Sequence, residues 1–490
     1  MSAPKISTLK ELKASQYKPT SIKQELRRNL IKSIKAKGNP FDGIWGYENT
    51  VIPQIERAIL SKHNIILLGL RGQAKTKIAR LMVNLLDEWM PVVSGSEIND
   101  DPLNPISRYA FDKIAEHGLE TPISWVHRSD RYYEKLATPD VTIADLIGDI
   151  DPIKAANMRL SYADDRVIHF GMIPRANRSI FVINELPDLQ PRIQVALFNI
   201  LQEGDMQIRG FKLRLNPDLQ FLFTANPEDY TNRGSIITPL KDRIGSQILT
   251  HYPDSLETAS KITFQEAKLD DNQLDNVEVP HVARMLIEQI GVEARDSEYI
   301  DEKSGVSARM GITILENLMS SVERRMLMNN EKSSTVRLHD FLGAIPSITG
   351  KVELVYEGEQ EGAGLVAEHL LGKAVKTLFT KEFPDIADLK RTDEQNPYQD
   401  ILDFFATGNS IEMFEDYSDK EYKSDLSKLA ELKDFVMKHK DKDLVNELNF
   451  YSEMLLWTLA ENSKLDKSKV LNKITYTDLF NSYLRDSLKN

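Results

Sequence analysis

The fold is decided by the stretch Gly69-Leu70-Arg71-Gly72-Gln73-Ala74-Lys75-Thr76, which lies between an apolar run and an amphipathic segment. The apolar run Ile65-Ile66-Leu67-Leu68 is typical of a buried strand. The segment that follows has the apolar spacing of a helix, in Ile78, Leu81, Met82, Leu85 and Leu86. A strand that enters a helix through a glycine-containing turn directs backbone N–H groups and the positive end of the helix toward one point. We therefore predict a phosphate-binding loop here.

The residue types in this loop predict a nucleotide and Mg²⁺ as its ligands. Lys75 is expected to reach the β- and γ-phosphates, and Thr76 is expected to ligate Mg²⁺. The residues expected to contact the nucleotide are Gly69, Arg71, Gly72, Gln73, Ala74, Lys75 and Thr76. The usual motif has glycine before the lysine, so Ala74 must accept the backbone conformation that starts the helix. The alternative is an ordinary strand-to-helix turn with an exposed lysine.

Composition bounds the class of protein. At 490 residues the chain is too long for one compact core, so we expect about three domains. With 62 basic and 74 acidic residues the net charge is −12, which argues against a surface devoted to nucleic acid. The absence of cysteine excludes disulfides, thiolate zinc sites and cysteine nucleophiles, and the histidines lack metal-site spacing. Without a membrane-length apolar run or a signal peptide, the chain is expected in the cytoplasm.

Two further apolar runs predict strands of the same sheet. Residues 180–183 end in Asn184-Glu185, and residues 221–223 end in Thr224-Ala225-Asn226. Helical patterns separate the runs, as in a parallel α/β sheet. One of these helices has Ile193, Leu197, Ile200 and Leu201 on one face. After it comes the stretch from Gln207 to Leu215, in which apolar and basic residues alternate from Phe211 to Leu215 after Arg209-Gly210, and this predicts a β-hairpin.

The rest of the chain is predicted to be helical. Residues 1–40 form a basic extension, read as a solvated helix with Leu26, Leu30, Ile31 and Ile34 at helical spacing. The α/β core is expected over 41–254, an all-helical lid over 255–348, and a helical C-terminal domain without a catalytic motif over 349–490. Expected helices include 51–60, 282–290, 312–328, 426–436 and 444–459.

Polar residues at the ends of the predicted strands are the candidate catalytic groups. Glu185 is the expected general base, and Asn184 holds the position from which a carboxylate normally contacts the Mg²⁺ shell. A neutral amide still accepts a hydrogen bond from metal-bound water but adds no charge, so weaker Mg²⁺ binding or slower hydrolysis is expected. Asn226 is expected to orient the attacking water. The alternative is a buried strand whose terminal glutamate caps the next turn.

Arginines outside the loop are candidates for sensing the γ-phosphate. Arg243 follows a turn and is expected to project toward the nucleotide of a neighbouring subunit, with Arg233 as a second candidate. The alternative for Arg243 is a salt bridge with Asp242 or another acid. Arg309 is placed at the start of a helix in the predicted lid, and it is either a γ-phosphate contact or a surface arginine.

Taken together, these residues resemble the AAA+ ATPases, and among them the group of MoxR and the magnesium-chelatase I subunit. The resemblance covers roughly Phe41 to Ile348 and rests on several ordered motifs. Residues 145–151 and 169–177 resemble the insertion in helix 2 of that group and the segment leading to its Walker B strand. Residues 202–205 with the hairpin 209–214 resemble its pre-sensor-1 β-hairpin.

The resemblance implies a role for each motif residue. Lys75 and Thr76 correspond to Walker A, Asn184 and Glu185 to Walker B, Asn226 to sensor 1, Arg243 to the arginine finger and Arg309 to sensor 2. It implies ATP and Mg²⁺ as cofactors and a ring oligomer, usually a hexamer. Such rings remodel or mature client proteins, often with a von Willebrand A-type partner, or drive metal insertion. The chain itself has no D-x-S-x-S motif in its tail, so such a partner would be a separate chain.

Three hypotheses follow. The first is an ATP-hydrolysing ring chaperone of the MoxR and chelatase type, without a membrane or nucleic-acid partner. The second is a nucleotide-switched binding module with little turnover, because Asn184 weakens the metal site. The third is a DNA-dependent motor that touches phosphates through Arg209, Lys212 and Arg214, against which the acidic balance and the lack of a DNA-binding motif argue.

Overall fold

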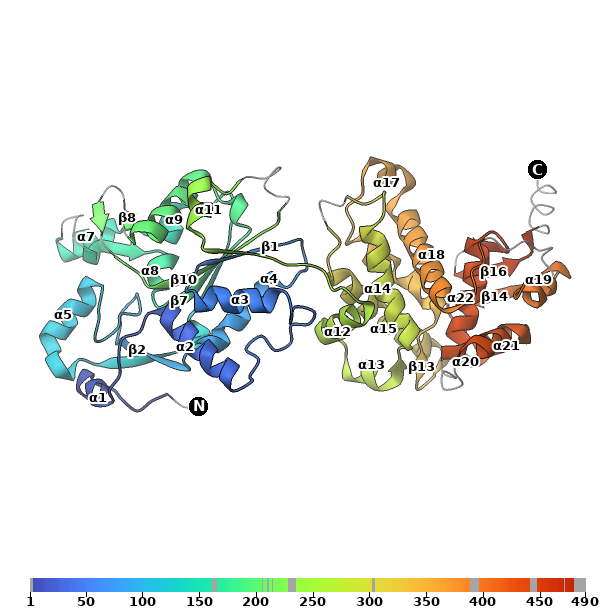
Figure 1. Cartoon of the computed structure of the whole chain (residues 1–490), viewed down its shortest axis with the longest axis horizontal. Helices are drawn as coiled ribbons and strands as arrows, with labels where there is room; N and C mark the ends of the chain where they lie inside the picture. Colours follow the sequence, from blue (N-terminus) through green and yellow to red (C-terminus); the bar gives the residue numbers. More distant parts are fainter. Residues whose placement is uncertain are drawn as a thin grey trace. The chain divides into compact units, whose positions relative to one another are not determined.

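The computed structural model describes residues 3–160, 165–204, 206–208, 211–213, 215–227, 235–301, 305–387, 396–440, 447–470 and 472–479. The chain divides into two compact units, Met1–His251 and Tyr252–Asn490. Figure 1 draws the elements of both units, coloured along the chain. The division falls close to the predicted end of the α/β core at residue 254, and the finer domain boundaries stay predictions.

A five-stranded sheet lies at the centre of the first unit (Figure 1). All four neighbouring pairs in this sheet are parallel. The two strands predicted after β1 are present in it, while the two edge strands, β4 and β11, were not predicted. In spatial order the strands are β11 (Ser246–Leu249), β1 (Ile65–Leu68), β10 (Leu219–Ala225), β7 (Ser179–Asn184) and β4 (Tyr132–Leu136).

Helices cover both faces of this sheet because its central strands are apolar on both faces. One face packs against α2 (Ile22–Lys35), α3 (Val51–Leu60) and α4 (Lys75–Leu81). The opposite face packs against α6 (Ile143–Leu146), α8 (Met172–Arg175), α9 (Pro191–Glu203) and α11 (Thr238–Arg243). The predicted αβα core with a parallel sheet is therefore confirmed. The other helices that the structure describes in this unit are α1 (Leu9–Ala14), α5 (Arg108–His117) and α7 (Pro152–Met158), with 3-10 turns η1 (Met82–Leu85), η2 (Gly118–Glu120), η3 (Arg128–Asp130), η4 (Asp165–Val167) and η5 (Leu186–Asp188).

The N-terminal helix α2 is buried against the core rather than solvated. Its side chains Leu26 and Leu30 are fully buried in the same cluster as α3, whereas Ile34 is exposed. Glu25 forms a bidentate ion pair with Arg131, both bonds 2.7 Å long, and both side chains are buried. The apolar stripe that predicted the helix therefore packs on the core, because a stripe of this width needs a partner surface.

In the described part of the first unit, three antiparallel strand pairs lie outside the central sheet. The predicted hairpin is present as β8 (Met206–Ile208) and β9 (Phe211–Leu213), while Arg209, Gly210 and Arg214 lie outside the described residues. The two segments that resemble the helix-2 insertion and the approach to Walker B, 145–151 and 169–177, contribute to the pair β5 (Gly148–Ile150) and β6 (Ile168–Phe170). The third pair is β2 (Trp89–Val93) with β3 (Ile123–His127).

The second unit is mainly helical, as predicted, and one apolar cluster runs through it from Val277 to Tyr476. It also contains a three-stranded antiparallel sheet that the sequence did not predict, β14 (Ile411–Phe414), β16 (Lys473–Thr477) and β15 (Asp466–Val470), and a short parallel pair, β12 (Val277–Glu278) with β13 (Ser334–Thr335). Its helices are α12 (Leu256–Glu266), α13 (Asp271–Asn276), α14 (His281–Arg295), α15 (Arg309–Asn329), η6 (Leu338–Ala344), α16 (Ile345–Thr349), α17 (Tyr356–Glu361), α18 (Ala363–Glu382), α19 (Gln399–Ala406), α20 (Asp419–Leu426), α21 (Ala430–His439) and α22 (Leu448–Glu461). Within the described ranges, every helix is too short or too polar to cross a lipid bilayer.

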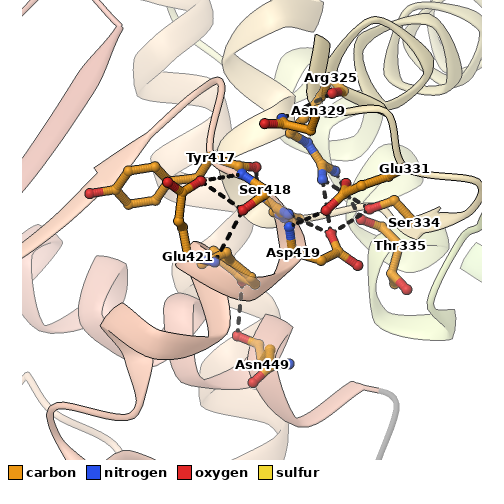
Figure 2. A network of polar contacts seen from close by, with 12 residues as sticks. Arg325, Asn329, Glu331, Ser334, Thr335, Tyr417, Ser418, Asp419, Glu421 and Asn449 are labelled. Atoms are coloured by element: carbon orange, nitrogen blue, oxygen red, sulfur yellow. Dashed lines mark hydrogen bonds and ion pairs between the residues drawn. The ribbon is translucent and has the colours of Figure 1, made fainter. Parts of the chain in front are cut away.

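A buried polar network joins α15 to the start of α20 (Figure 2). The carboxylate of Asp419 accepts hydrogen bonds from Ser334 at 2.6 Å, Arg337 at 2.5 Å and Arg325 at 3.2 Å. Burial alone would raise the pKa of Asp419, but the hydrogen bonds from Ser334 and Arg337 outweigh it and lower that pKa. Arg325 is 1% exposed and also bonds Asp340 at 3.1 Å. The predicted lid (255–348) and the predicted C-terminal domain (349–490) therefore share ionic contacts as well as one apolar core.

Glu453 on α22 makes the stability of this unit depend on pH. Its Oε2 accepts from the Tyr422 hydroxyl at 2.9 Å and the Leu338 backbone N–H at 3.1 Å, while its Oε1 has no partner among the described residues. Complete burial raises the pKa of Glu453 from 4.5 to about 7, and the nearby Asp340 acts in the same direction. At pH values between 4.5 and about 7, the Glu453 carboxyl is deprotonated in the unfolded chain and protonated in the folded chain. Stability therefore falls as the pH rises through this window.

We predict that Glu453→Gln removes this loss. The neutral amide keeps the shape of the protonated acid, so variant and wild type should have similar stability at pH 4.5. By pH 8 the variant should be the more stable by roughly 3 kcal/mol, the linkage of one proton over the window. Denaturant unfolding at both pH values measures the difference. A gap that stays constant with pH would contradict the assignment.

Candidate functional site

The predicted loop lies between β1 and α4 and has the backbone of a tight cradle. Gly72 and Ala74 both have positive φ, +78° and +56° respectively. Ala74 thus accepts the left-handed conformation that the sequence required of it. A Cβ atom at Gly69 would lie 1.9 Å from the Thr250 hydroxyl and 2.2 Å from Gln73 Oε1, so only glycine fits there. The loop is therefore closed tightly at its first residue.

Residues from outside the loop fix its shape. The Thr250 hydroxyl, just beyond β11, donates to Gln73 Oε1 at 2.7 Å. The Tyr47 hydroxyl donates to the carbonyl oxygens of His251 at 2.7 Å and Gln73 at 3.2 Å. Gln73 is 6% exposed. Neither Tyr47 nor Thr250 was predicted as a site residue, since nothing in the local sequence pattern connects them with the loop.

Lys75 has its ammonium group inside the loop. Its Nζ donates to the carbonyl of Leu70 at 2.9 Å and to that of Gly69, and the residue is 9% exposed. This contradicts the alternative of an ordinary turn with an exposed lysine. A buried ammonium held by two carbonyl oxygens is positioned to exchange them for phosphate oxygens, which are better partners for its charge.

The candidate residues after β1, β10 and β7 lie side by side at one edge of the sheet. The Gly69 N–H donates to the Ala225 carbonyl at 3.1 Å, which fixes Asn226 beside the start of the loop. The Glu185 N–H donates to the Thr224 hydroxyl at 3.2 Å. Glu185 has φ +54°, so the chain turns sharply where β7 ends, and Asn226 is 5% exposed. Loop, predicted base and predicted water-orienting residue therefore share the carboxyl edge of three adjacent strands, where α/β proteins bind ligands.

Asn184, the last residue of β7, lies between two polar neighbours. Its Nδ2 donates to Glu134 Oε1 at 2.6 Å, and its Oδ1 accepts from the Thr224 hydroxyl at 3.0 Å. A carboxylate only accepts, so the amide nitrogen must face Glu134. Glu134 on β4 was not predicted as a site residue, because its short amphipathic strand has no apolar run.

The residues at this edge fit Mg²⁺. They offer oxygen atoms from Thr76, Asn184 and Glu134, and oxygen ligands are those that Mg²⁺ prefers. Among the described residues no three His, Asp or Glu side chains gather as a metal-binding group. A cation here would therefore be held largely by the phosphates of a nucleotide, with few protein ligands, as is usual for Mg²⁺.

The predicted arginines have different surroundings. Arg243, the last residue of α11, bonds Asp242 at 3.0 Å and Gln202 at 3.3 Å, and its guanidinium lies 5.9 Å from the Phe198 ring centroid. The alternative salt bridge to Asp242 is thus present within the subunit, with 43% of the Arg243 side chain exposed. Arg309 begins α15 of the second unit and is exposed. Arg233 lies outside the described residues.

Comparison with known families identifies the class of the first unit. Residues 123–244 match the family model of the AAA domain, dynein-related subfamily. The match begins at β3, includes β4, β7 and β10, and ends just after α11, so it covers the strands that carry Glu134, Asn184, Glu185 and Asn226. The predicted phosphate-binding loop, residues 69–76, precedes the matched range and is separate evidence. Residues 123–244 therefore identify an AAA domain within the first unit, as the motifs predicted.

The solved structures that this chain matches include three of low sequence identity. An ATPase predicted from Cytophaga hutchinsonii shares 18% identity over 74% of this chain and 97% of its own, with a TM-score of 0.29. The complex between subunits BchI and BchD of magnesium chelatase shares 18% identity over 66% of this chain and 98% of its own, with a TM-score of 0.35. NtrX from Brucella abortus shares 12% identity over 53% of this chain and 47% of its own, with a TM-score of 0.31. The match therefore spans about half of the NtrX chain. The first unit is assigned by its family match and its own geometry, not by these likenesses.

Proposed function

We propose that the protein is a cytoplasmic ATP-hydrolysing AAA+ machine of the MoxR and magnesium-chelatase type. It assembles into a ring, expected to be a hexamer, and it remodels or matures client proteins. The observation that carries the proposal is the shared sheet edge, where a loop with a buried lysine adjoins Glu185 and Asn226. ATP with Mg²⁺ is the expected ligand pair, and a separate von Willebrand A-type chain is a candidate partner.

Each residue at the edge has a proposed task. The loop 69–76 binds the phosphates, with Lys75 contacting the β- and γ-phosphates. Thr76 and Asn184 hold the metal shell, and Mg²⁺, when bound, neutralises charge on the phosphate oxygens. Glu185 accepts the proton of the attacking water, which Asn226 orients. Arg243 of a neighbouring subunit is the proposed arginine finger, and Arg309 the proposed sensor 2.

A second function is favoured by one observation. Asn184 is neutral and both ends of its amide are already hydrogen-bonded. A site with reduced charge supports a nucleotide-switched binding module that holds ATP with little turnover. The two functions share ATP binding and differ only in hydrolysis.

Turnover by the full-length wild type decides between them. We expect steady-state phosphate release from ATP in the presence of Mg²⁺, together with an increase in particle mass to that of a ring. Tight ATP binding without phosphate release would favour the switch instead. Capture of client proteins on Glu185→Gln with ATP, followed by release with ADP, is the matching test of the chaperone activity, and Lys75→Ala is its control.

A further inference from the structure

Glu134 lies where it can restore the charge that Asn184 lacks. It is on β4, the strand next to β7, and the parallel register pairs Glu134 with Val182 and Leu136 with Asn184. Side chains two residues apart on a strand share a face, so Glu134 and Asn184 lie on the same face of the sheet. The 2.6 Å bond from Asn184 Nδ2 to Glu134 Oε1 joins them directly.

The other oxygen of Glu134 connects this pair to the helix that follows the loop. Oε2 accepts from Arg80 Nε at 3.2 Å and from an Arg80 terminal nitrogen at 3.0 Å. These bonds raise the pKa of the Arg80 guanidinium above its usual value. Arg80 follows Thr76 by four residues in α4, so the two residues share one side of that helix. The carboxylate therefore bridges the end of β7 and the side of α4 that carries Thr76.

An exposed ion pair alone does not account for this arrangement. The Arg80 side chain is 65% exposed, and such pairs contribute little to stability. Glu134, however, is only 23% exposed and gives one of its oxygens to an amide rather than to the arginine. An aspartate at position 184 would put a second carboxylate at the distance of that hydrogen bond, where two negative charges repel strongly. Asn184 and Glu134 thus form a pair with one negative charge.

We propose that Glu134 supplies the anionic group of the Mg²⁺ shell, in place of the carboxylate that usually ends the strand now ending in Asn184. Asn184 and Arg80 are positioning residues that fix the two oxygens of Glu134. This inference rests on the proposed nucleotide site and adds to it a residue on a different strand. Asn184 then does not imply that the site lacks a negative charge, because Glu134 on β4 carries the charge of the Asn184–Glu134 pair.

The test is the Mg²⁺ dependence of nucleotide binding by the full-length chain. A fluorescent ATP analogue is titrated into wild type and variants, once with Mg²⁺ and once with EDTA. In Glu134→Gln, the increase in affinity that Mg²⁺ produces should be smaller than in wild type by about tenfold or more, as for other residues that support a metal site. Asn184→Asp should also lose affinity, because it crowds two carboxylates. The double variant Asn184→Asp with Glu134→Gln returns one charge to β7 and should recover most of the gain.

Affinity in EDTA serves as the internal control, because it reports the loop without the metal. It should be unchanged in Asp112→Asn, which removes an exposed acid paired with Arg108 on α5, and in the three variants it should fall far less than the affinity with Mg²⁺ does. Equal Mg²⁺ dependence in wild type and Glu134→Gln, or a double variant no better than Asn184→Asp alone, would overturn the inference. A Glu134→Gln chain that loses affinity equally in EDTA would overturn it in favour of a structural role. A wild type that binds the analogue in neither condition would overturn the proposed function itself.

Discussion

Lys75→Ala is expected to abolish ATP binding. Lys75 is 9% exposed, and the substitution removes its ammonium group, which is bonded to the Gly69 and Leu70 carbonyls inside the loop. Removing one partner of a buried charged contact costs about 2–5 kcal/mol, which corresponds to a loss of roughly 30-fold to several thousand-fold in affinity. Titration calorimetry with ATP and Mg²⁺ measures the loss directly.

Lys77→Ala is the matched control for this prediction. It removes the same functional group from the same helix, two residues farther on, at a position with no predicted phosphate contact. Its affinity for ATP should stay within about threefold of wild type, the range expected of a surface substitution. If Lys75→Ala and Lys77→Ala bound ATP equally well, the loop would not be the phosphate site.

Glu185→Gln is expected to stop hydrolysis while leaving ATP bound. The amide cannot accept the proton of the attacking water, and general-base catalysis typically contributes about 10²–10⁴-fold. The backbone at Glu185 is anchored through its N–H to Thr224, so the side-chain change leaves the end of β7 in place. Phosphate release should therefore fall by at least about 100-fold, with little change in ATP affinity.

The control here is Asp188→Asn, an acid in the 3-10 turn η5 that directly follows Glu185. It should keep most of the wild-type turnover, and only Glu185→Gln should accumulate as an ATP-bound assembly. Steady-state phosphate release at saturating ATP compares the two variants. Unchanged turnover in Glu185→Gln would show that another group is the base.

The centre of the fold was predictable because its signals are local. Residues 65–68, 180–183 and 221–223 are continuous apolar runs, as expected for strands covered by helices on both faces. The glycines and the Lys75-Thr76 pair identified the loop within eight residues. Strand β4, by contrast, alternates Tyr132 and Glu134 with Tyr133 and Lys135 at the sheet edge, and it presents no apolar run.

The C-terminal sheet was missed for a different reason. Strand β14 pairs with β16, whose register joins Ile411 to Tyr476 across a long stretch of helical chain. Such pairing depends on the fold bringing distant segments together, and neither segment has a hairpin signal that connects it with the other. Two helices with apolar stripes of their own, predicted over 426–436 and 444–459, are observed as α21 (Ala430–His439) and α22 (Leu448–Glu461), whereas α19 and α20 were not predicted.

The residues of the candidate site likewise divide into those with a local sequence signal and those that only the fold brings together. Lys75, Glu185 and Asn226 were found because each follows an apolar strand, and parallel strands end at a common edge. Glu134, Tyr47 and Thr250 contact the site from segments far away in the sequence, and only the fold connects them. Asn184, which stands where the motif usually has a carboxylate, pointed to a missing charge, and its neighbour Glu134 is the residue proposed to supply one.

The central claim is that the carboxyl edge of β1, β10 and β7 binds a nucleotide triphosphate. A structure of the full-length protein with Mg²⁺ and a non-hydrolysable ATP analogue tests it most directly. We predict triphosphate density within residues 69–76, in contact with Lys75, and with Glu185 and Asn226 facing the terminal phosphate. Analogue density elsewhere on the chain, with Lys75 still bonded to the Gly69 and Leu70 carbonyls, would contradict it.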